Sequence, residues 1–358
     1  MTNCTRILDK AVTGGRITDE EALALFEEAG LLEVGSAADA VSRRLHPEPF
    51  RTYVIDRNIN YTNICISKCK FCAFWRDAGA AEAYVLADEE IHHKVAEAVN
   101  LGATQILMQG GLHPDFGIEW YERLVRRIKE KFSVHLHSFS PPEVVHMAGV
   151  SHLSVEDVIV RLRDAGLDSI PGGGAEILTD ASRKSLSPRK CTASEWLEVM
   201  ETAHRLGMRT TATMMFGHTE TYADRVAHLS RIRDLQDRMG GFTAFIPWTF
   251  QPANTALGGQ EVGGYHYLHT VAISRIYLDN FPNLQASWVT QGAKIGQVAL
   301  RFGANDLGST MIEENVVAAA GVRFRMNEEE LRQAIREAGY VPCRRDTYYR
   351  LLEPVPSG

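Results

Sequence analysis

The sequence has few cysteines, no long apolar run and no excess of positive charge. Six cysteines in 358 residues are too few for the disulfide framework of a small secreted protein. No stretch approaches the apolar length that crosses a bilayer, and the region after Met1 lacks the apolar core of a signal peptide. The formal net charge of −7 leaves no basic footprint for nucleic acid or an anionic membrane. We therefore expect a cytoplasmic protein with no nucleic-acid or membrane partner.

Short apolar runs alternate with amphipathic stretches along most of the chain. With 45% hydrophobic and 23% charged residues, the chain is long enough to bury a large core. The apolar runs predict eight strands, at residues 52–61, 104–109, 133–138, 167–171, 209–216, 242–248, 284–290 and 306–311. Helices are predicted to follow them, at 88–101, 118–131, 154–165, 193–207, 221–238, 264–280, 292–302 and 313–320. Eight such units predict an α/β fold, a (βα)8 TIM-like barrel.

Helical extensions are expected at both ends of this barrel. An N-terminal helix is predicted at 19–30, with Asp19 as its cap, and a C-terminal helix at 327–338, with Asn327 as its cap. The chain beyond is expected to form an irregular tail that includes Pro356. The expected division is therefore an N-terminal helical extension, the barrel and a C-terminal extension packed on the barrel, at residues 1–49, 50–320 and 321–358.

Three closely spaced cysteines form the most informative motif, Cys65-Ile-Ser-Lys-Cys69-Lys-Phe-Cys72. Thiolates are soft donors that select iron–sulfur clusters, zinc or copper(I). A zinc site would need four nitrogen or sulfur ligands in a closed tetrahedron, and no finger or ribbon spacing is offered by the nearest candidates, His92, His93 and Cys191. A cubane held by three cysteines keeps one iron open, and an open metal site predicts chemistry.

The spacing C-x3-C-x2-C, with the aromatic Phe71 before the last cysteine, resembles the signature of the radical S-adenosylmethionine (SAM) superfamily. The resemblance implies a [4Fe-4S] cluster on Cys65, Cys69 and Cys72, with SAM bound to the open iron and Phe71 against the adenine. It also implies an external electron donor, such as a flavodoxin or ferredoxin. Reduction of the cluster would then cleave SAM to a 5′-deoxyadenosyl radical.

Two glycine-rich segments follow the second and fourth predicted strands, where such barrels carry ligand-binding loops. Gln109-Gly110-Gly111 resembles the superfamily motif whose backbone carbonyls bind the SAM ammonium. The segment from Pro171 to Glu176 lacks the lysine and hydroxyl of a P-loop, so it is expected to let backbone approach a ligand closely. Glu176 is a candidate for the ribose hydroxyls or ammonium of SAM, and Arg183 for its carboxylate. Ser138, which ends the third strand, is a further cofactor-binding candidate.

Polar residues at the ends of the other strands supply candidates for catalysis and substrate binding. His218 and Glu220 could relay a proton, although the same residues suit the capped start of a helix equally well. His113 and Asp306 are the next candidates for a general base. Substrate-binding candidates are chosen by strand-end position alone, and they are Thr213, Trp248, Ser287 and Gln291.

Longer segments resemble one branch of the superfamily. Similarity to the radical SAM enzymes of the futalosine route to menaquinone is carried by residues 105–114, 135–143, 166–177 and 210–218. Similarity to the cyclic dehypoxanthine futalosine synthases is carried by residues 245–252, 285–292 and 301–306. The resemblance runs from about Tyr53 to Thr347, which is nearly the whole chain.

This narrower resemblance implies a nucleoside-derived small-molecule substrate and a radical cyclisation. In that reaction the deoxyadenosyl radical removes the ribose C4′ hydrogen of dehypoxanthine futalosine, and the carbon radical adds to the benzoate ring. Loss of an electron and a proton then restores aromaticity in a spirocyclic product. The pocket must therefore bind a carboxylate, an aromatic ring and sugar hydroxyls, and it must provide a base.

Other activities remain open at the level of sequence. Aminofutalosine synthases add an adenosyl radical to an enol ether, and deazaflavin-precursor synthases share the barrel and much of the patterning. The segment 285–292 favours the cyclase over both. A non-catalytic metal-binding scaffold is the alternative from a different class, but a scaffold needs no cavity lined by the polar ends of eight strands.

Overall fold

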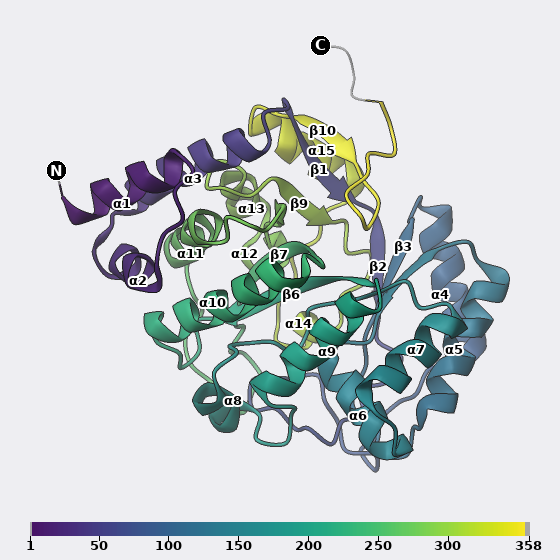
Figure 1. Ribbon diagram of the computed structural model, residues 1–358. Coiled ribbons are helices and arrows are strands. Elements are labelled where there is room, and N and C mark those ends of the chain that lie inside the picture. The colour runs from purple at the N-terminus through teal and green to yellow at the C-terminus, as the bar shows by residue number, and fades with distance from the viewer. Residues whose placement is uncertain (1, 355–358) are drawn as a thin grey trace.

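Parallel strands curl around a common axis at the centre of the computed structural model, which describes residues 2–354 (Figure 1). Seven of them form one sheet in sequence order: β2 (Asp56–Ile59), β3 (Gln105–Met108), β4 (His135–Ser138), β5 (Ser169–Ile170), β6 (Arg209–Phe216), β7 (Phe242–Thr249) and β8 (Asn283–Leu284). A second sheet has the order β10-β1-β9, with β1 (Phe50–Val54), β9 (Asp306–Ser309) and β10 (Val341–Arg344). The strand pairs in both sheets are parallel.

The two sheets join into one barrel. β1 continues into β2 after Ile55, and a parallel bridge pairs Gln285, which follows β8, with Asp306 of β9. The amide of Ala286 strengthens this join by donating to the carbonyl of Asp306 at 2.9 Å. The predicted α/β barrel is therefore confirmed. β5 and β8 have only two residues each, so the helices and loops around them hold that side together.

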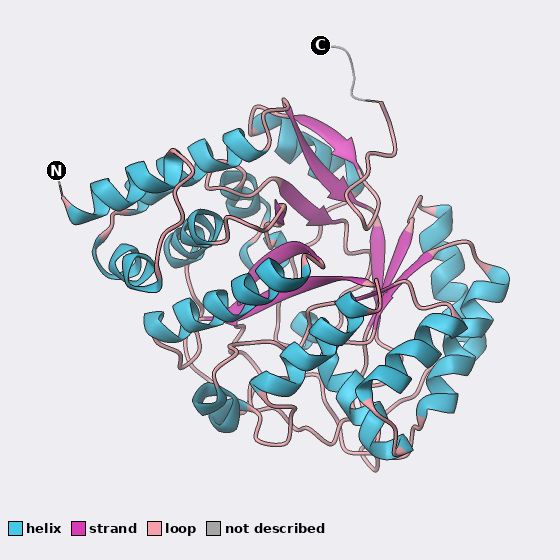
Figure 2. Cartoon of the chain, viewed as in Figure 1, coloured by secondary structure: helices cyan, strands magenta, loops and turns pink. Residues whose placement is uncertain are grey.

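Helices cover the outside of the barrel (Figure 2). The connections contain α4 (Asp88–Asn100), α5 (Ile118–Lys131), α6 (Pro141–Ser151), α7 (Val155–Ala165), α8 (Asp180–Leu186), α9 (Ala193–Arg205), α10 (Tyr222–Met239), α11 (Gly264–Tyr277), α12 (Trp288–Gln291) and α13 (Ala293–Ala299). The remaining helices are α1 (Asn3–Val12), α2 (Asp19–Glu28), α3 (Leu31–Leu45), α14 (Val316–Ala319) and α15 (Glu328–Glu337). The buried faces of most of these helices share one continuous apolar core with the strands. Within residues 2–354, every helix is too short or too polar to span a bilayer.

The N-terminal helices α1, α2 and α3 lie against α10 and α11 (Figure 1). The cap predicted for α2, Asp19, is wrong. Thr18, and not Asp19, caps α2, because its hydroxyl accepts from the amide of Glu21 at 3.2 Å and the Glu21 carboxylate accepts from the amide of Thr18 at 2.9 Å. Asp19 instead accepts a hydrogen bond from the hydroxyl of Tyr277 on α11. The sequence pattern also missed α1, α3, α6 and α8.

Two further expectations differ from the structure. The strand expected at 284–290 ends at Leu284, and the chain then turns into α12, because the indole N–H of Trp288 donates to the carbonyl of Ser309 at 3.0 Å. This tertiary contact overrides the β propensity of the run. The expected irregular tail contains β10, which pairs with β1 from Phe50 onward. Pro356 lies outside the described residues, and the domain division stays a prediction.

Candidate active site

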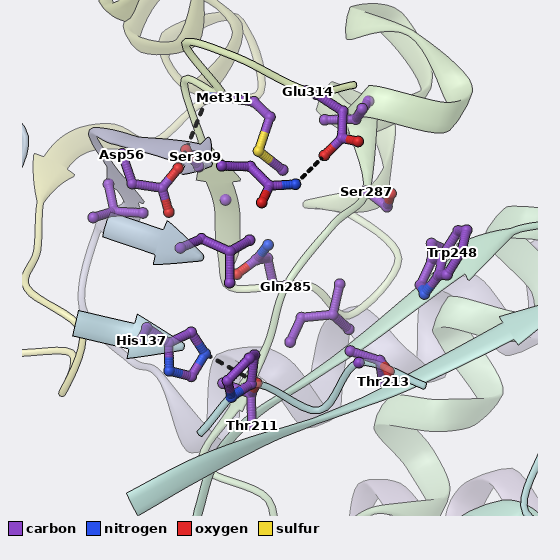
Figure 3. Close-up of a pocket in the computed structure, with 18 of the residues that line it drawn as sticks. Asp56, His137, Thr211, Thr213, Trp248, Gln285, Ser287, Ser309, Met311 and Glu314 are labelled. Atoms are coloured by element: carbon purple, nitrogen blue, oxygen red, sulfur yellow. Dashed lines mark hydrogen bonds between the residues drawn. The ribbon is translucent and has the colours of Figure 1, made fainter. Parts of the chain in front are cut away.

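A cavity of about 270 Å³ lies inside the barrel (Figure 3). Strands β1 to β9, or the residues that directly follow them, all contribute to its wall. The wall combines apolar side chains with polar ones that end or follow the strands, among them Asn58, Gln109, Thr211, Thr213, Trp248, Gln285, Ser287 and Glu314. In Figure 3, Glu314 and Met311 lie on one side of the cavity, and His137 and Thr211 lie on the other. The cavity suits a small molecule held by hydrogen bonds and apolar contacts.

The segment after β10 contributes to the cavity wall at the amino ends of the strands. The Thr347 hydroxyl donates to Gln105 at 2.6 Å, and the Arg345 guanidinium pairs with Asp306 at 2.6 and 2.9 Å. Asp306 also accepts from the hydroxyl of Thr52 and is fully buried. Although burial opposes it, the Asp306 carboxylate raises the pKa of Arg345. The geometry therefore gives Asp306 a structural ion pair, and its predicted role as a base stays untested.

The three cysteines of the motif lie on the loop that follows β2. The amide of Cys72 donates to the carbonyl of Cys69 at 3.2 Å, and the hydroxyl of Ser67 lies 3.2 Å from the Cys69 sulfur. Burial raises the pKa of the Cys69 thiol and raises that of Cys72 to about 11. Metal binding would therefore displace thiol protons. All six cysteines of the chain are free.

The loop supplies three thiols, which is the type and number of ligands that a cluster with one open iron requires. If deprotonated, Cys69 and Cys65 would each raise the pKa of the Cys72 thiol further. Among residues 2–354, no three Cys, His, Asp or Glu side chains are already gathered as a metal-ligand set. The assignment of Cys65, Cys69 and Cys72 as ligands therefore rests on their spacing and stays a prediction.

Gly110 and Gly111 pack directly on the base of the cysteine loop. A Cβ atom on Gly111 would lie 2.2 Å from the carbonyl oxygen of Ile64, and a Cβ atom on Gly110 would meet the Tyr61 ring at 2.4 Å. The amide of Gly110 donates to the buried carboxylate of Glu143 at 3.0 Å, and the amide of Gly111 donates to the Thr62 carbonyl at 2.9 Å. Glycine is therefore needed at position 111 for the close approach of two backbones, and at position 110 for the close approach of the Tyr61 ring.

Glu176 forms a buried ion pair close to the cysteine loop. Lys190 donates to its carboxylate at 2.5 Å, and the same ammonium lies 5.3 Å from the centroid of Phe71. Burial would raise the pKa of Glu176, but the charge and the hydrogen bond of Lys190, together with the charge of Arg183, lower the pKa overall. Sequence reasoning missed Lys190, because the lysine lies outside any strand end.

Arg183 has its guanidinium engaged by the protein. It donates to the carbonyl of Cys191 at 2.9 and 2.5 Å and to the carbonyls of Gly174 and Ala175 at 3.1 and 2.7 Å. These contacts hold the glycine-rich segment in place. The predicted pairing of Arg183 with a SAM carboxylate stays a prediction, and it would require this arrangement to change.

The other predicted bases do not line the cavity. Glu220 accepts from the amides of Gly217 and His218 at 2.7 and 2.9 Å and pairs with Arg225 at 2.6 Å, so it braces the loop before α10. The ring of His218 is buried, with Nδ1 3.1 Å from Glu220. His113 stacks on Phe116 with ring centroids 3.7 Å apart. Their catalytic roles stay predictions.

The structure brings together most of the predicted substrate-binding residues. Thr213, Trp248 and Ser287 line the cavity, as does Gln109. Gln291 does not, because its amide donates to Thr249 at 2.8 Å and to the carbonyl of Val262 at 3.0 Å. The remaining cofactor candidate, Ser138, ends β4 with a buried hydroxyl that has no partner within residues 2–354.

Sequence reasoning missed several residues of the wall, chiefly Asn58 and Glu314. Asn58 belongs to the predicted first strand, in the run Asp56-Arg57-Asn58-Ile59-Asn60, and alternation would have placed it on the same face as Asp56. Glu314 follows the eighth strand, so the strand-end rule would have found it. Neither residue belongs to a motif of fixed spacing.

Comparisons with known proteins agree with this geometry. The model of the radical SAM superfamily matches residues 59–232, and the model of the CofH/MqnC C-terminal region matches residues 239–357. A cyclic dehypoxanthine futalosine synthase from Halalkalibacterium halodurans is 49% identical over 97% of this chain and 94% of its own length. The chain belongs to the radical SAM superfamily. It is therefore an enzyme of the radical SAM type, and family membership implies a [4Fe-4S] cluster and SAM as its cofactors.

Two other curated relatives of this radical SAM protein differ in their names. A cyclic dehypoxanthine futalosine synthase from Streptomyces coelicolor is 49% identical over 97% of this chain and 88% of its own length. A 5-amino-6-(D-ribitylamino)uracil–L-tyrosine 4-hydroxyphenyl transferase from Archaeoglobus fulgidus is 45% identical over 88% of this chain and 92% of its own. The two activities therefore have to be separated by their substrates.

Solved structures show the same fold at low sequence identity. Methylornithine synthase aligns with a TM-score of 0.73 at 17% identity, covering 94% of this chain and 97% of its own. The FeFe-hydrogenase maturase HydG from Carboxydothermus hydrogenoformans aligns with a TM-score of 0.75 at 15% identity, covering 97% of this chain and 80% of its own. These neighbours support the barrel.

Proposed function

We propose that this protein is a cyclic dehypoxanthine futalosine synthase, which converts dehypoxanthine futalosine to its cyclic form in menaquinone biosynthesis. The observation that supports it most strongly is the 49% identity to two enzymes of that name over 97% of the chain. The cavity supports it independently, because polar groups from all sides of the barrel enclose a space of about 270 Å³.

The cysteine loop would hold the cluster through Cys65, Cys69 and Cys72. When bound, the cluster and SAM together supply a 5′-deoxyadenosyl radical. Gly110 and Gly111 let the loop pack closely on β3, and the Glu143 carboxylate fixes the amide of Gly110. The chain thus orients its cofactor-binding loops through backbone contacts.

The barrel would hold the substrate next to that loop. Trp248 offers an apolar face for an aromatic ring, and the barrel wall keeps bulk water away from reactive carbon. Among the described residues, the cavity wall carries one arginine, Arg345, which is already paired with Asp306. The amide groups of Gln109 and Gln285 are therefore the candidates to bind the benzoate carboxylate.

The second candidate function is the transfer of a 4-hydroxyphenyl group from tyrosine to 5-amino-6-(D-ribitylamino)uracil. It is supported by the 45% identity to the enzyme from Archaeoglobus fulgidus. The electron donor is proposed to be an external flavodoxin or ferredoxin in either case.

Anaerobically reconstituted protein tests the proposal, with SAM, a reductant and dehypoxanthine futalosine as reactants. We expect a product two hydrogens lighter than the substrate, together with 5′-deoxyadenosine, and the loss of both in Cys69→Ala. Cys343→Ala is the matched control, because this buried cysteine lies on β10 and outside the motif. Deoxyadenosine without a change in substrate mass would contradict the substrate assignment.

A further inference from the structure

Two consecutive glutamates after β9 face opposite sides of the barrel wall. Glu313 faces outward and pairs with Arg57 of β2 at 2.6 Å and with Lys94 of α4 at 2.9 Å. Glu314 faces the cavity and accepts from the side-chain amide of Asn58 at 2.7 Å. Arg57 and Asn58 are neighbours on a strand, so their side chains point to opposite faces and match the two glutamates.

The backbone of this segment is fixed along β1 and β2. The backbone amide of Thr310 donates to the carbonyl of Val54 at 3.1 Å, and the backbone amide of Ile312 donates to the carbonyl of Asp56 at 3.1 Å. Asn58 in turn donates to the carbonyl of Glu313 at 3.3 Å. Met311, between Thr310 and Ile312, takes a φ of +46°, in the left-handed region that non-glycine residues rarely adopt. Such a conformation persists where the surroundings hold it, and strained backbone is often found at functional sites.

Glu314 is a half-buried residue whose carboxylate the protein holds with neutral donors. Besides Asn58, the amides of Val316 and Val317 donate to it at 2.7 and 3.1 Å. No ion pair within residues 2–354 involves it. The charge of Asp56 on β2 acts on Glu314, and Arg325 lines a small side pocket with it. Three donors leave the carboxylate room for at least one more.

Asn58 supplies a second acceptor at the same place. Its side chain is 3% exposed, and its Oδ1 atom is buried without a hydrogen-bond partner within residues 2–354. Asn58 contacts Glu314 through its amide nitrogen, so its amide oxygen takes no part in this contact. A buried acceptor with no partner costs free energy that a ligand donor would recover.

We propose that Asn58 and Glu314 form a hydroxyl-binding subsite that accepts hydrogen bonds from the polyol part of the substrate. The subsite rests on the proposed function in that the ribose of dehypoxanthine futalosine is its expected ligand. Both groups present oxygen acceptors, and vicinal hydroxyls supply two donors on adjacent carbon atoms. The same acceptors repel a carboxylate, so the benzoate end of the substrate points away from Glu314.

Glu314→Gln reverses the hydrogen-bonding character of this subsite without changing its size. The new amide would keep its contacts only if Asn58 turned its oxygen toward residue 314, which would put an N–H where the unpartnered oxygen of Asn58 now lies. Asn58→Ala is the second variant, because it removes the unpartnered oxygen directly. Glu119→Gln is the matched control, since Glu119 lies on the outer helix α5 with 71% of its side chain exposed.

The experiment measures equilibrium binding to the cluster-loaded protein with SAM and without a reductant, so that no turnover occurs. The probes are dehypoxanthine futalosine and its 2′-deoxy and 3′-deoxy analogues. We expect the wild type and Glu119→Gln to bind at least one deoxy analogue about 10- to 100-fold more weakly than the parent, the range of a hydrogen bond to a charged group. We expect Glu314→Gln and Asn58→Ala to bind the parent more weakly by a similar factor and to discriminate less than about threefold between parent and analogue.

Two outcomes separate this subsite from the proposed function. If wild type, Glu314→Gln and Asn58→Ala bind the parent and both analogues equally well, the subsite is overturned while the cyclase stands. If the wild type binds 5-amino-6-(D-ribitylamino)uracil in place of dehypoxanthine futalosine, and Glu314→Gln loses that binding, the cyclase assignment fails. The subsite is then supported on a ribityl chain.

Discussion

Gly111 lies where the loop after β3 meets the base of the cysteine loop. A Cβ atom at this position would lie 2.2 Å from the carbonyl oxygen of Ile64 and 2.7 Å from its carbon. Side-chain Cβ atoms essentially never approach another heavy atom closer than 3.0 Å, so the two backbones would have to separate by about 0.8 Å, the difference between 2.2 and 3.0 Å. The contact is with backbone, so no flexible side chain can absorb the shift.

Gly111→Ala should therefore strain the cysteine loop. Overpacking of this kind costs about 1–3 kcal/mol. If the strain is released by moving the loop away from its cluster-binding position, cluster affinity falls by about 5- to 150-fold. The loop is anchored directly after this contact, by the amide of Cys65 to the carbonyl of Arg76 and by the amide of Ile66 to that of Leu112, so these hydrogen bonds are the first to lengthen.

Iron and acid-labile sulfide per chain, measured after anaerobic reconstitution at limiting iron, report this effect. Gly79→Ala is the matched control, because a Cβ at Gly79 on the same connection meets no atom within 4 Å. We expect Gly79→Ala to load like the wild type and Gly111→Ala to load substantially less. Full loading and an unchanged melting temperature in Gly111→Ala would refute the argument from close packing.

Two predictions concern stability. Arg345→Met should lower the free energy of unfolding by about 3–5 kcal/mol in urea denaturation, because Asp306 stays buried without its cation. The double variant Asp306→Asn with Arg345→Met should recover part of this loss. Equal losses in the single and double variants would contradict this. Burial lowers the pKa of His228 to about 3 and that of His204 to about 4. A lowered pKa means that the unfolded chain takes up the proton first, so this stability is present above about pH 6.5 and is lost as the pH falls toward 4, at up to roughly 1.4 kcal/mol per pH unit for each histidine. His228→Gln should make the fall in the free energy of unfolding shallower by one such contribution, and an unchanged slope would refute the assignment.

The barrel was predictable because its signal is local and repeated. Each of the eight apolar runs was long enough to mark a strand, and amphipathic helices separated most of them. The helix starting at Trp288 was not predictable from the same rules, since an indole contact with β9 decides it. β10 was missed for a related reason, because its partner β1 lies almost 300 residues away in the sequence. Pairing over such a distance leaves no local pattern.

The cofactor-binding loops were easier to predict from sequence than the substrate site. The cysteine motif and the glycine pair have fixed spacing, and the structure places them side by side. The proposed bases were chosen by residue type, and burial in loop-bracing contacts separates His218 and Glu220 from the cavity. Asn58 and Glu314 were missed because no motif of fixed spacing marks them, although strand alternation and strand-end position point to them. The unpartnered oxygen of Asn58, which gives the pair its significance, is visible only in three dimensions.

A competition assay tests the central claim most directly. Cluster-loaded protein would receive SAM, a reductant, dehypoxanthine futalosine, 5-amino-6-(D-ribitylamino)uracil and tyrosine in one anaerobic vessel, with products followed by mass. The account predicts that dehypoxanthine futalosine is the one candidate substrate consumed, and that a product two hydrogens lighter forms together with 5′-deoxyadenosine from SAM. Consumption of tyrosine and the ribitylaminouracil, with dehypoxanthine futalosine left unchanged, would contradict it.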